Sequence, residues 1–164
     1  TAQKDPLLFI ELASRRARRY SADEERYLVV GDGELAPRLR ERIAGCELGD
    51  RVIMAGFRTD VDAVLDSLDV FVLHSRYEGM PYTILEAMGH ALPIVTTRVA
   101  GVADPLRDGG LIVEIGDVTG LDAALDHLVN SERQRELGTA NRSRLEQHFS
   151  LEKMIAALLE IYCG

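Results

Sequence analysis

The sequence contains no tryptophan and only two cysteines, and aromatic residues make up 5% of its 164 positions. Because Cys46 and Cys163 stand alone, we expect no disulfide framework, and a reducing compartment is the default. No apolar run approaches the roughly 20 residues that a membrane-spanning helix needs, and no secretory hydrophobic segment opens the chain. We therefore expect a cytoplasmic protein.

Basic residues are outnumbered: 19 lysines and arginines face 27 aspartates and glutamates, which gives a formal net charge of −8. This balance argues against nucleic acid as the main partner. The His, Cys, Asp and Glu residues show no metal-ligand spacing, so we expect no bound metal, and the G-x-S-x-G pattern of a hydrolase is missing. The 46% hydrophobic content and the length suit one soluble domain with a real core.

Short apolar runs alternate with helix-like segments along the whole chain. This alternation predicts an α/β fold with a Rossmann-like, doubly wound parallel sheet, in a single domain over residues 1–164. We expect Asp5, Asp60 and Ser131 to cap helices and Gly31-Asp32-Gly33 to form a tight turn. The expected strands are 27–30, 51–57, 69–73, 92–97 and 111–113. The expected helices are 5–19, 35–44, 60–68, one beginning near 81, 117 or 119 to 129, 131–147 and 150–162.

Four arginines gather between Arg15 and Arg19. Such a cluster can bind an anionic membrane or RNA. It also suits the C-terminal end of a helix, where cations are favourable, and the acidic segment 23–25 follows it. We favour the second interpretation.

The most informative stretch is the junction between the apolar run 70–73 and the helix that begins near Pro81. In an α/β fold, such a junction lies at the carboxyl end of the sheet, where ligands bind. Proline suits a helix start because its φ angle is preset, and Gly79 lets the backbone approach a ligand closely. The free amides at the start of the helix would then face an anion.

Glu78 and Glu86 flank this junction. If Glu78 lies in the loop, Glu86 sits five residues past Pro81, about 7–8 Å along the helix at about 1.5 Å per residue. That separation is close to the span from a phosphate to a neighbouring ribose, and carboxylates bind vicinal hydroxyl groups well. We therefore expect both carboxylates to face one elongated ligand.

The stretch EGMPYTILEAM, followed by GHALPIV, resembles the carboxyl-terminal domain of retaining GT-B glycosyltransferases of group 1, or family 4. The resemblance extends from Lys4 to Tyr162. It implies the donor-binding half of a GT-B fold, which holds a UDP- or GDP-linked sugar for transfer to a saccharide or lipid-linked acceptor. It also implies an amino-terminal acceptor-binding domain outside this chain, through which the full-length protein could associate with the inner face of a membrane.

By this resemblance, Glu78 contacts the donor sugar and Glu86 the ribose. Lys4 faces the diphosphate together with an arginine upstream of Thr1, so Glu78 and Lys4 are the expected catalytic residues. No cofactor is implied, since the nucleotide sugar is a substrate. The remaining donor-binding candidates are Ser75 and the backbone around Gly79, Met80 and Pro81, with Gly56 and Phe57 at the nucleobase.

Some positions keep two interpretations. Phe57 can be a core or lid residue, and His74 can reach the donor or be structural. His90, His127 and His148 look like surface residues. Two positions depart from the family pattern, in which a glycine is common where Ala91 stands and a glutamate where Asp104 stands.

The alternatives in function are another GT-B enzyme, such as a nucleotide-sugar epimerase or a trehalose or sucrose synthase-like protein, and a non-catalytic module that binds nucleotide or a partner enzyme. We expect residues 1–164 alone to transfer no sugar.

Overall fold

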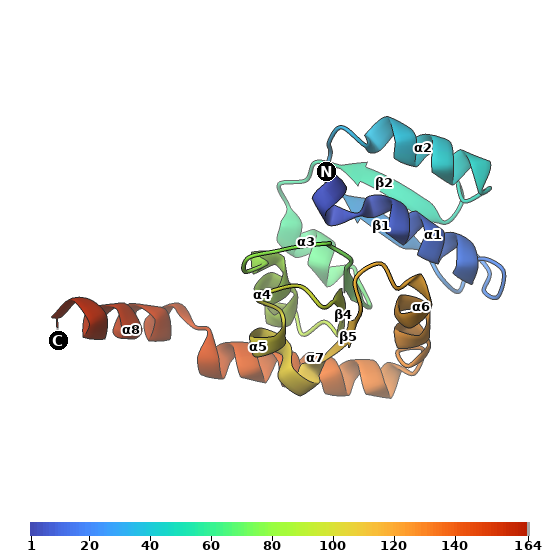
Figure 1. Ribbon diagram of the computed structural model, residues 1–164. Coiled ribbons are helices and arrows are strands. Elements are labelled where there is room, and N and C mark those ends of the chain that lie inside the picture. The colour runs from blue at the N-terminus through green and yellow to red at the C-terminus, as the bar shows by residue number, and fades with distance from the viewer. Residues whose placement is uncertain (164) are drawn as a thin grey trace.

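The computed structural model describes residues 1–163. Strands and helices alternate along this part of the chain, as the sequence predicts (Figure 1). The strands are β1 (Tyr27–Val30), β2 (Val52–Gly56), β3 (Phe71–Leu73), β4 (Ile94–Thr97) and β5 (Gly110–Val113). The helices are η1 (Ala2–Lys4), α1 (Pro6–Arg16), α2 (Ala36–Gly45), α3 (Val61–Asp66), α4 (Tyr82–Gly89), α5 (Ala103–Leu106), η2 (Arg107–Gly109), α6 (Val118–Asp126), α7 (Ser131–His148) and α8 (Leu151–Cys163).

All strand pairs are parallel, which confirms the expected fold class, but the strands form two sheets. One sheet has the order β1-β2 and the other β3-β4-β5. Strand β4 has a partner on each side, and all four of its residues are buried. The sequence analysis expected one sheet; the division arises because β1 and β3 do not pair with each other within residues 1–163.

Helices cover both faces of the β3-β4-β5 sheet. On one face, α1 lies between α2 and α6, and these helices share a core with both sheets through residues such as Tyr27, Val52 and Val95 (Figure 1). On the other face, α3, α4 and α5 enclose a second core around Leu73, Ile84 and Ile94, and α7 packs against α4 and α5. This layering places the start of α4 at the carboxyl end of β3.

The arginines at the C-terminal end of α1 lie where the favoured interpretation placed them, and several of them also pair with acidic residues of α6. Arg16 is 1% exposed and donates hydrogen bonds to Glu25, Asp122 and Asp126, two of them on α6. Arg19 pairs with the same two aspartates. The cluster is therefore an ion network between α1 and α6, and removing one member would leave buried charge uncompensated.

The expected N-cap positions are confirmed at Asp5 and Asp60, and the one expected at Ser131 is wrong. Neither Asp5 nor Asp60 caps its helix with its side chain; each pairs with an arginine instead, Asp60 with Arg58. The cap of α7 is Asn130, whose side chain accepts from the Glu132 amide, so Ser131 is the first helical residue. A nearby guanidinium competes for the carboxylate in the first two cases, which a local pattern does not reveal.

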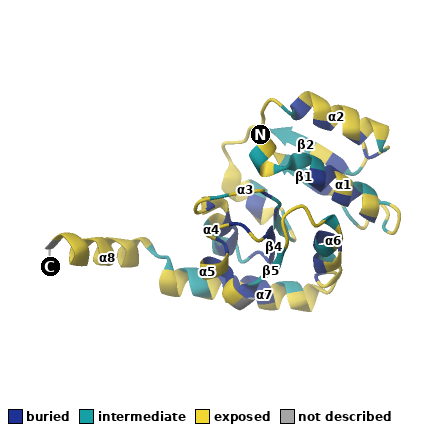
Figure 2. Cartoon of the chain, in the orientation of Figure 1, coloured by how far each residue is buried: buried dark blue, intermediate teal, exposed yellow. Residues whose placement is uncertain are grey.

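Helix α8 extends away from the rest of the molecule (Figure 1). Its residues 151–162 are all exposed (Figure 2). Its large exposed apolar side chains are Leu151, Met154, Ile155, Leu158, Leu159, Ile161 and Tyr162, and all but Ile161 recur at spacings of three or four along the helix. This periodicity is that of an amphipathic helix whose apolar side packs on nothing within residues 1–163.

Candidate functional site

The Glu78 carboxylate lies in the loop between β3 and α4 and is fixed from two sides. The Lys4 ammonium donates to Oε1 at 2.6 Å, and the Ser75 hydroxyl donates to the same oxygen at 2.6 Å. The Glu78 side chain is 9% exposed, whereas that of Lys4 is 48% exposed. The structure thus brings together three of the residues that the sequence proposed for the site.

The surroundings of Glu78 favour its charged form. Burial by itself would raise the pKa of the carboxyl group, but the hydrogen bonds from Lys4 and Ser75 outweigh it and hold the pKa below its usual range. Glu78 is therefore an anion at neutral pH. Its second oxygen, Oε2, makes no hydrogen bond within residues 1–163, so it remains able to accept one from a ligand hydroxyl.

Ser75 is itself held in place by the neighbouring strand. Its side chain is fully buried, and its carbonyl oxygen accepts a 2.6 Å hydrogen bond from the hydroxyl of Thr97, the last residue of β4. Thr97 is also fully buried. A chain of hydrogen bonds therefore runs from the buried end of β4 through Ser75 to Glu78.

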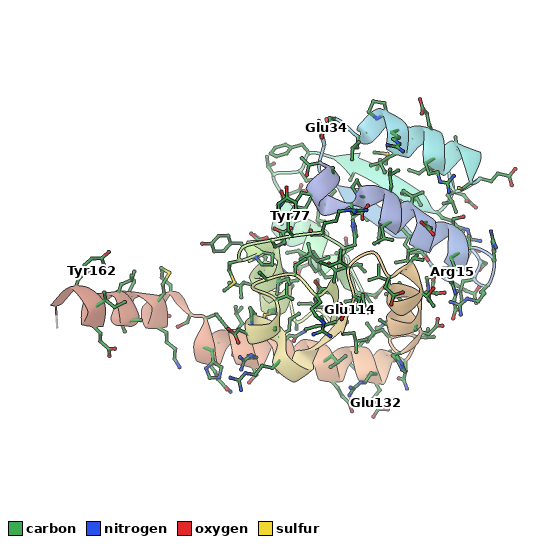
Figure 3. The ribbon with its side chains drawn as sticks, viewed as in Figure 1. Arg15, Glu34, Tyr77, Glu114, Glu132 and Tyr162 are labelled. Atoms are coloured by element: carbon green, nitrogen blue, oxygen red, sulfur yellow. The ribbon has the colours of Figure 1, made fainter. Side chains whose placement is uncertain are left out.

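Lys4 is positioned by the contacts of its neighbours with the same loop. The Gln3 side chain donates to the Tyr77 carbonyl at 3.0 Å, and the Arg76 amide donates to the Gln3 carbonyl at 2.8 Å. Figure 3 shows Tyr77 beside the start of α1. Asp5 has a left-handed backbone (φ 45°) and pairs with Arg76 at 2.9 Å. The ion pair explains why Asp5, although it is the N-cap residue of α1, makes no cap hydrogen bond with its side chain.

The start of α4 presents free backbone donors beside this loop. Pro81 is the N-cap residue (φ −74°, ψ 99°), and the amides of Tyr82 and Thr83 donate to no acceptor within residues 1–163. Gly101, with φ 77°, lets the two loops approach closely, because an added Cβ there would overlap the Gly79 carbonyl. An anion at this helix terminus would meet oriented N–H groups and the positive end of the helix dipole.

Glu86 lies in the second turn of α4 and differs from Glu78 in its surroundings. It is exposed, and its carboxylate makes no hydrogen bond or ion pair within residues 1–163. Gly79 and Met80 are likewise exposed, whereas Pro81 is buried. The Glu86 carboxylate is therefore free to bind hydroxyl groups, but no protein contact fixes its position.

Gly56 and Phe57 follow β2 and so belong to the other sheet from Glu78. Gly56 has φ 66°, a left-handed conformation that favours glycine. Phe57 is 77% exposed, which rules out a core role within residues 1–163. Its contact with a nucleobase stays a prediction.

Two of the histidines, His74 and His90, make structural contacts with neighbouring side chains. The His74 ring stacks on Phe9 with ring centroids 5.0 Å apart, and burial lowers the pKa of His74, so the ring is neutral. His90 is only partly exposed and bonds Asp66 at 2.6 Å and Asp62 at 3.2 Å, so it links α4 to α3. The expectation of a surface residue was therefore incomplete for His90, while His127 and His148 are exposed.

Several residues that shape the site carry no clear signal in the sequence. Gln3 and Arg76 act through contacts between residues far apart in the chain, and in the sequence Thr97 looks like any other β-branched strand residue. Gly101 could have been found, since an isolated glycine in a loop often marks a close backbone approach. Within residues 1–163, no three His, Cys, Asp or Glu side chains gather to hold a metal ion.

Comparison with known proteins assigns the family. Residues 1–131 match the family described as glycosyl transferases group 1. The chain belongs to this family. The resemblance seen in the sequence is therefore confirmed, and with it the expected GT-B type of domain.

Among individual proteins, the chain is 30% identical to the Vi polysaccharide biosynthesis protein VipC/TviE of Salmonella typhi, over 96% of this chain and 28% of that protein. It is 28% identical to the UDP-Gal:alpha-D-GlcNAc-diphosphoundecaprenol alpha-1,3-galactosyltransferase of Escherichia coli, over 98% of this chain and 42% of that enzyme. The fold matches that of a point mutant of S. aureus TarM, solved in complex with UDP, with a TM-score of 0.92 at 23% identity, over 99% of this chain and 33% of TarM. The chain thus spans less than half the length of these relatives.

No helix within residues 1–163 is both long and apolar enough to cross a bilayer.

Proposed function

We propose that residues 1–164 form the donor-binding domain of a retaining glycosyltransferase and bind a nucleoside-diphosphate sugar, with UDP as the nucleotide. The observation that carries this proposal is the Glu78 anion, fixed by Lys4 and Ser75 beside the free amides at the start of α4. Sugar hydroxyls and a diphosphate need these two features side by side, an anionic acceptor and a set of oriented donors.

The related proteins support the choice of UDP and of the acceptor class. The E. coli relative is named for a UDP-galactose donor and a diphosphoundecaprenol-linked acceptor, and TarM was solved with UDP. We therefore propose transfer from a UDP-sugar to a saccharide or lipid-linked acceptor.

The geometry supports a proposed role for each of these groups. Cleavage of the bond between the sugar and the diphosphate leaves negative charge on the departing UDP. The Lys4 ammonium and the amides of Tyr82 and Thr83 would stabilise that charge, a task that a metal ion performs in other enzymes. The free Glu78 oxygen would hold a sugar hydroxyl, and Glu86 the ribose hydroxyls.

We also propose that this domain needs a second domain of the same protein for transfer. The curated relatives are more than twice as long as the matched segment, and α8 exposes an apolar side that no residue in 1–163 covers. In such two-domain enzymes, closure of the second domain excludes water and completes the acceptor site. Residues 1–164 alone are expected to transfer no sugar, although slow hydrolysis of the donor is compatible with an open site.

Calorimetric titration of residues 1–164 with UDP, GDP and ADP, each with and without EDTA, tests the proposal. We expect UDP to bind with a dissociation constant on the order of 0.1–1 mM, since the site is open on one side. Lack of binding by any nucleotide, or binding that disappears with EDTA, would refute it. The intact protein should transfer sugar under conditions in which residues 1–164 do not.

A further inference from the structure

Exposed aromatic side chains gather at the carboxyl ends of the strands. The large exposed side chains of residues 1–163 include four aromatic rings, those of Phe57, Tyr77, Tyr82 and Tyr162. The first three lie just after β2, between β3 and α4, and at the start of α4, in that order, and the fourth lies on α8. An aromatic ring buries a large apolar surface when it meets a partner, so three exposed rings at one edge of the strands indicate a binding surface.

Two of these rings, those of Tyr77 and Tyr82, flank the proposed donor site. Tyr77 directly precedes Glu78, and Tyr82 is the first residue of α4. Tyr77 is 64% exposed and Tyr82 is 74% exposed, whereas the Glu78 side chain is 9% exposed. The carboxylate is therefore nearly enclosed, while the two rings project into solvent.

Contacts within the protein do not account for these two rings. The hydroxyls of Tyr77 and Tyr82 make no hydrogen bond, and their rings make no ring–ring or cation–π contact within residues 1–163. The buried Tyr27 differs in both respects, because its hydroxyl bonds Glu25 and its ring packs edge-on against Phe9 at 5.8 Å. Tyr77 and Tyr82 thus keep both the apolar faces and the hydroxyls free for a ligand.

The backbones that carry the two rings are nevertheless held in place. The Tyr77 carbonyl accepts a hydrogen bond from the Gln3 side chain at 3.0 Å. Tyr82 follows the buried Pro81, whose carbonyl accepts from the Ile84 amide at 3.0 Å and closes the first turn of α4. A tyrosine side chain has two torsion angles, so a ring on a fixed backbone loses little conformational entropy when a ligand orders it.

The direction of α4 places the Tyr82 side chain at the open end of the site. The Cα–Cβ bonds of a helix tilt toward its N-terminus, so the side chain of the first residue extends toward the end that carries the free amides. In the proposed function, a donor bound by those amides and by Glu78 lies against the loop. An acceptor has to approach the donor sugar from the solvent side, where the two rings are exposed.

A sugar ring has the chemistry that these side chains can bind. One face of a pyranose presents C–H groups that pack on an aromatic ring, and its hydroxyls remain free to bond a tyrosine hydroxyl, a carboxylate or water. We propose that the rings of Tyr77 and Tyr82 form a subsite for a sugar unit of the acceptor, next to the donor sugar at Glu78. This inference rests on the proposed function, and it narrows the acceptor to a molecule that presents a pyranose ring.

NMR spectroscopy of residues 1–164 with saturating UDP tests the proposal. The probes are the methyl glycosides of glucose, galactose, mannose and N-acetylglucosamine, which carry no lipid, each added at tens of millimolar. We expect at least one of them to shift the ring signals of Tyr77 and Tyr82. Tyr162, which is 82% exposed and lies on α8, is the internal control for non-specific contact, and its ring signals should not move. The chain has five tyrosines, so the ring signals can be assigned with single Tyr→Phe variants.

Two double variants separate the rings from their hydroxyls. The saturation-transfer signal of the bound glycoside should fall by about threefold or more in Tyr77→Ala/Tyr82→Ala and should change little in Tyr77→Phe/Tyr82→Phe, which keeps both ring faces. Val129→Ala, which shortens a 61% exposed apolar side chain between α6 and α7, is the matched control. Because all the altered side chains are exposed, each variant should fold and bind UDP within about twofold of the wild type.

Three results, each obtained with UDP bound, would overturn the proposal and leave the proposed function standing. In the first, no glycoside shifts the signals of Tyr77 and Tyr82 more than those of Tyr162. In the second, the double alanine variant keeps the wild-type saturation-transfer signal. In the third, the double phenylalanine variant loses as much signal as the double alanine variant, which would assign the contact to the hydroxyls. Failure of the wild-type chain to bind UDP would refute the proposed function and this inference with it.

Discussion

Glu78 and Glu86 lie on either side of the start of α4, and they differ in solvent exposure and in side-chain contacts. Glu78 is nearly enclosed and is held by Lys4 and Ser75, whereas Glu86 is exposed and makes no side-chain bond within residues 1–163. A carboxylate that the protein has already oriented loses little freedom when a ligand binds, and a free one must be ordered by the ligand. This difference is the basis of our proposal that Glu78 acts at the reacting sugar and that Glu86 contributes binding alone.

The largest expected effect comes from removing the oriented carboxylate. In the intact protein, Glu78→Ala should lower the rate constant for sugar transfer by about 100-fold or more, because an interaction at the reacting sugar is lost. Glu86→Ala should act mainly on KM. Steady-state kinetics with a UDP-sugar distinguish the two variants. A larger fall in kcat for Glu86→Ala than for Glu78→Ala would contradict the assigned roles.

Lys4 is the next test, because it bonds Glu78 and, in the proposed function, faces the diphosphate. Lys4→Ala should weaken UDP binding to residues 1–164 by about 5–20-fold, since a charge-assisted hydrogen bond to phosphate is lost. The only other lysine, Lys153 on α8, provides a matched control. Calorimetry that finds equal affinity for Lys4→Ala and Lys153→Ala would remove Lys4 from the site.

Gly101 and Gly116 have similar backbone conformations, so a pair of alanine variants tests whether the loop around Gly79 contacts the ligand. Gly101 has φ 77° and Gly116 has φ 79°, so alanine is strained at both and should cost about 1–2 kcal/mol of stability. Only at Gly101 does the new methyl group overlap the Gly79 carbonyl. Gly101→Ala should therefore weaken UDP binding at least threefold more than Gly116→Ala. Equal binding by the two variants would show that the Gly79 backbone does not contact the ligand.

The smallest effect concerns the far end of α4. The hydrogen bond to Asp66, reinforced by Asp62, raises the pKa of His90 above its ordinary value of 6.5, against the opposing effect of burial. A raised folded-state pKa means that this stabilisation is complete below pH 6.5 and is lost as the pH rises through the folded pKa. The melting temperature should fall slightly between about pH 6 and about pH 8, and less in His90→Asn. An identical slope in both proteins would contradict the assigned link.

The sequence predicted the order of strands and helices and the position of the Glu78 loop, because apolar runs and the Pro81 start are local signals. It also identified Ala91 as unusual: Ala91 has φ 52° and closes the C-terminal turn of α4, where glycine is favoured. The buried ion pairs of Arg16 and the Thr97 contact with Ser75 could not be predicted. They join residues far apart in the chain, and a charge cluster in a sequence looks the same whether it is solvated or buried.

The central claim is that the two glutamates serve two ends of one ligand. Calorimetry of residues 1–164 with UDP, and then with a UDP-sugar that the protein binds, tests it in the wild type, Glu78→Ala and Glu86→Ala. Glu86→Ala should weaken the binding of both ligands by about 5–30-fold, the cost of about 1–2 kcal/mol for lost ribose hydrogen bonds. Glu78→Ala should leave UDP affinity within about threefold of the wild type and abolish the gain in affinity that the sugar provides. Equal losses of UDP affinity in the two variants would contradict the claim.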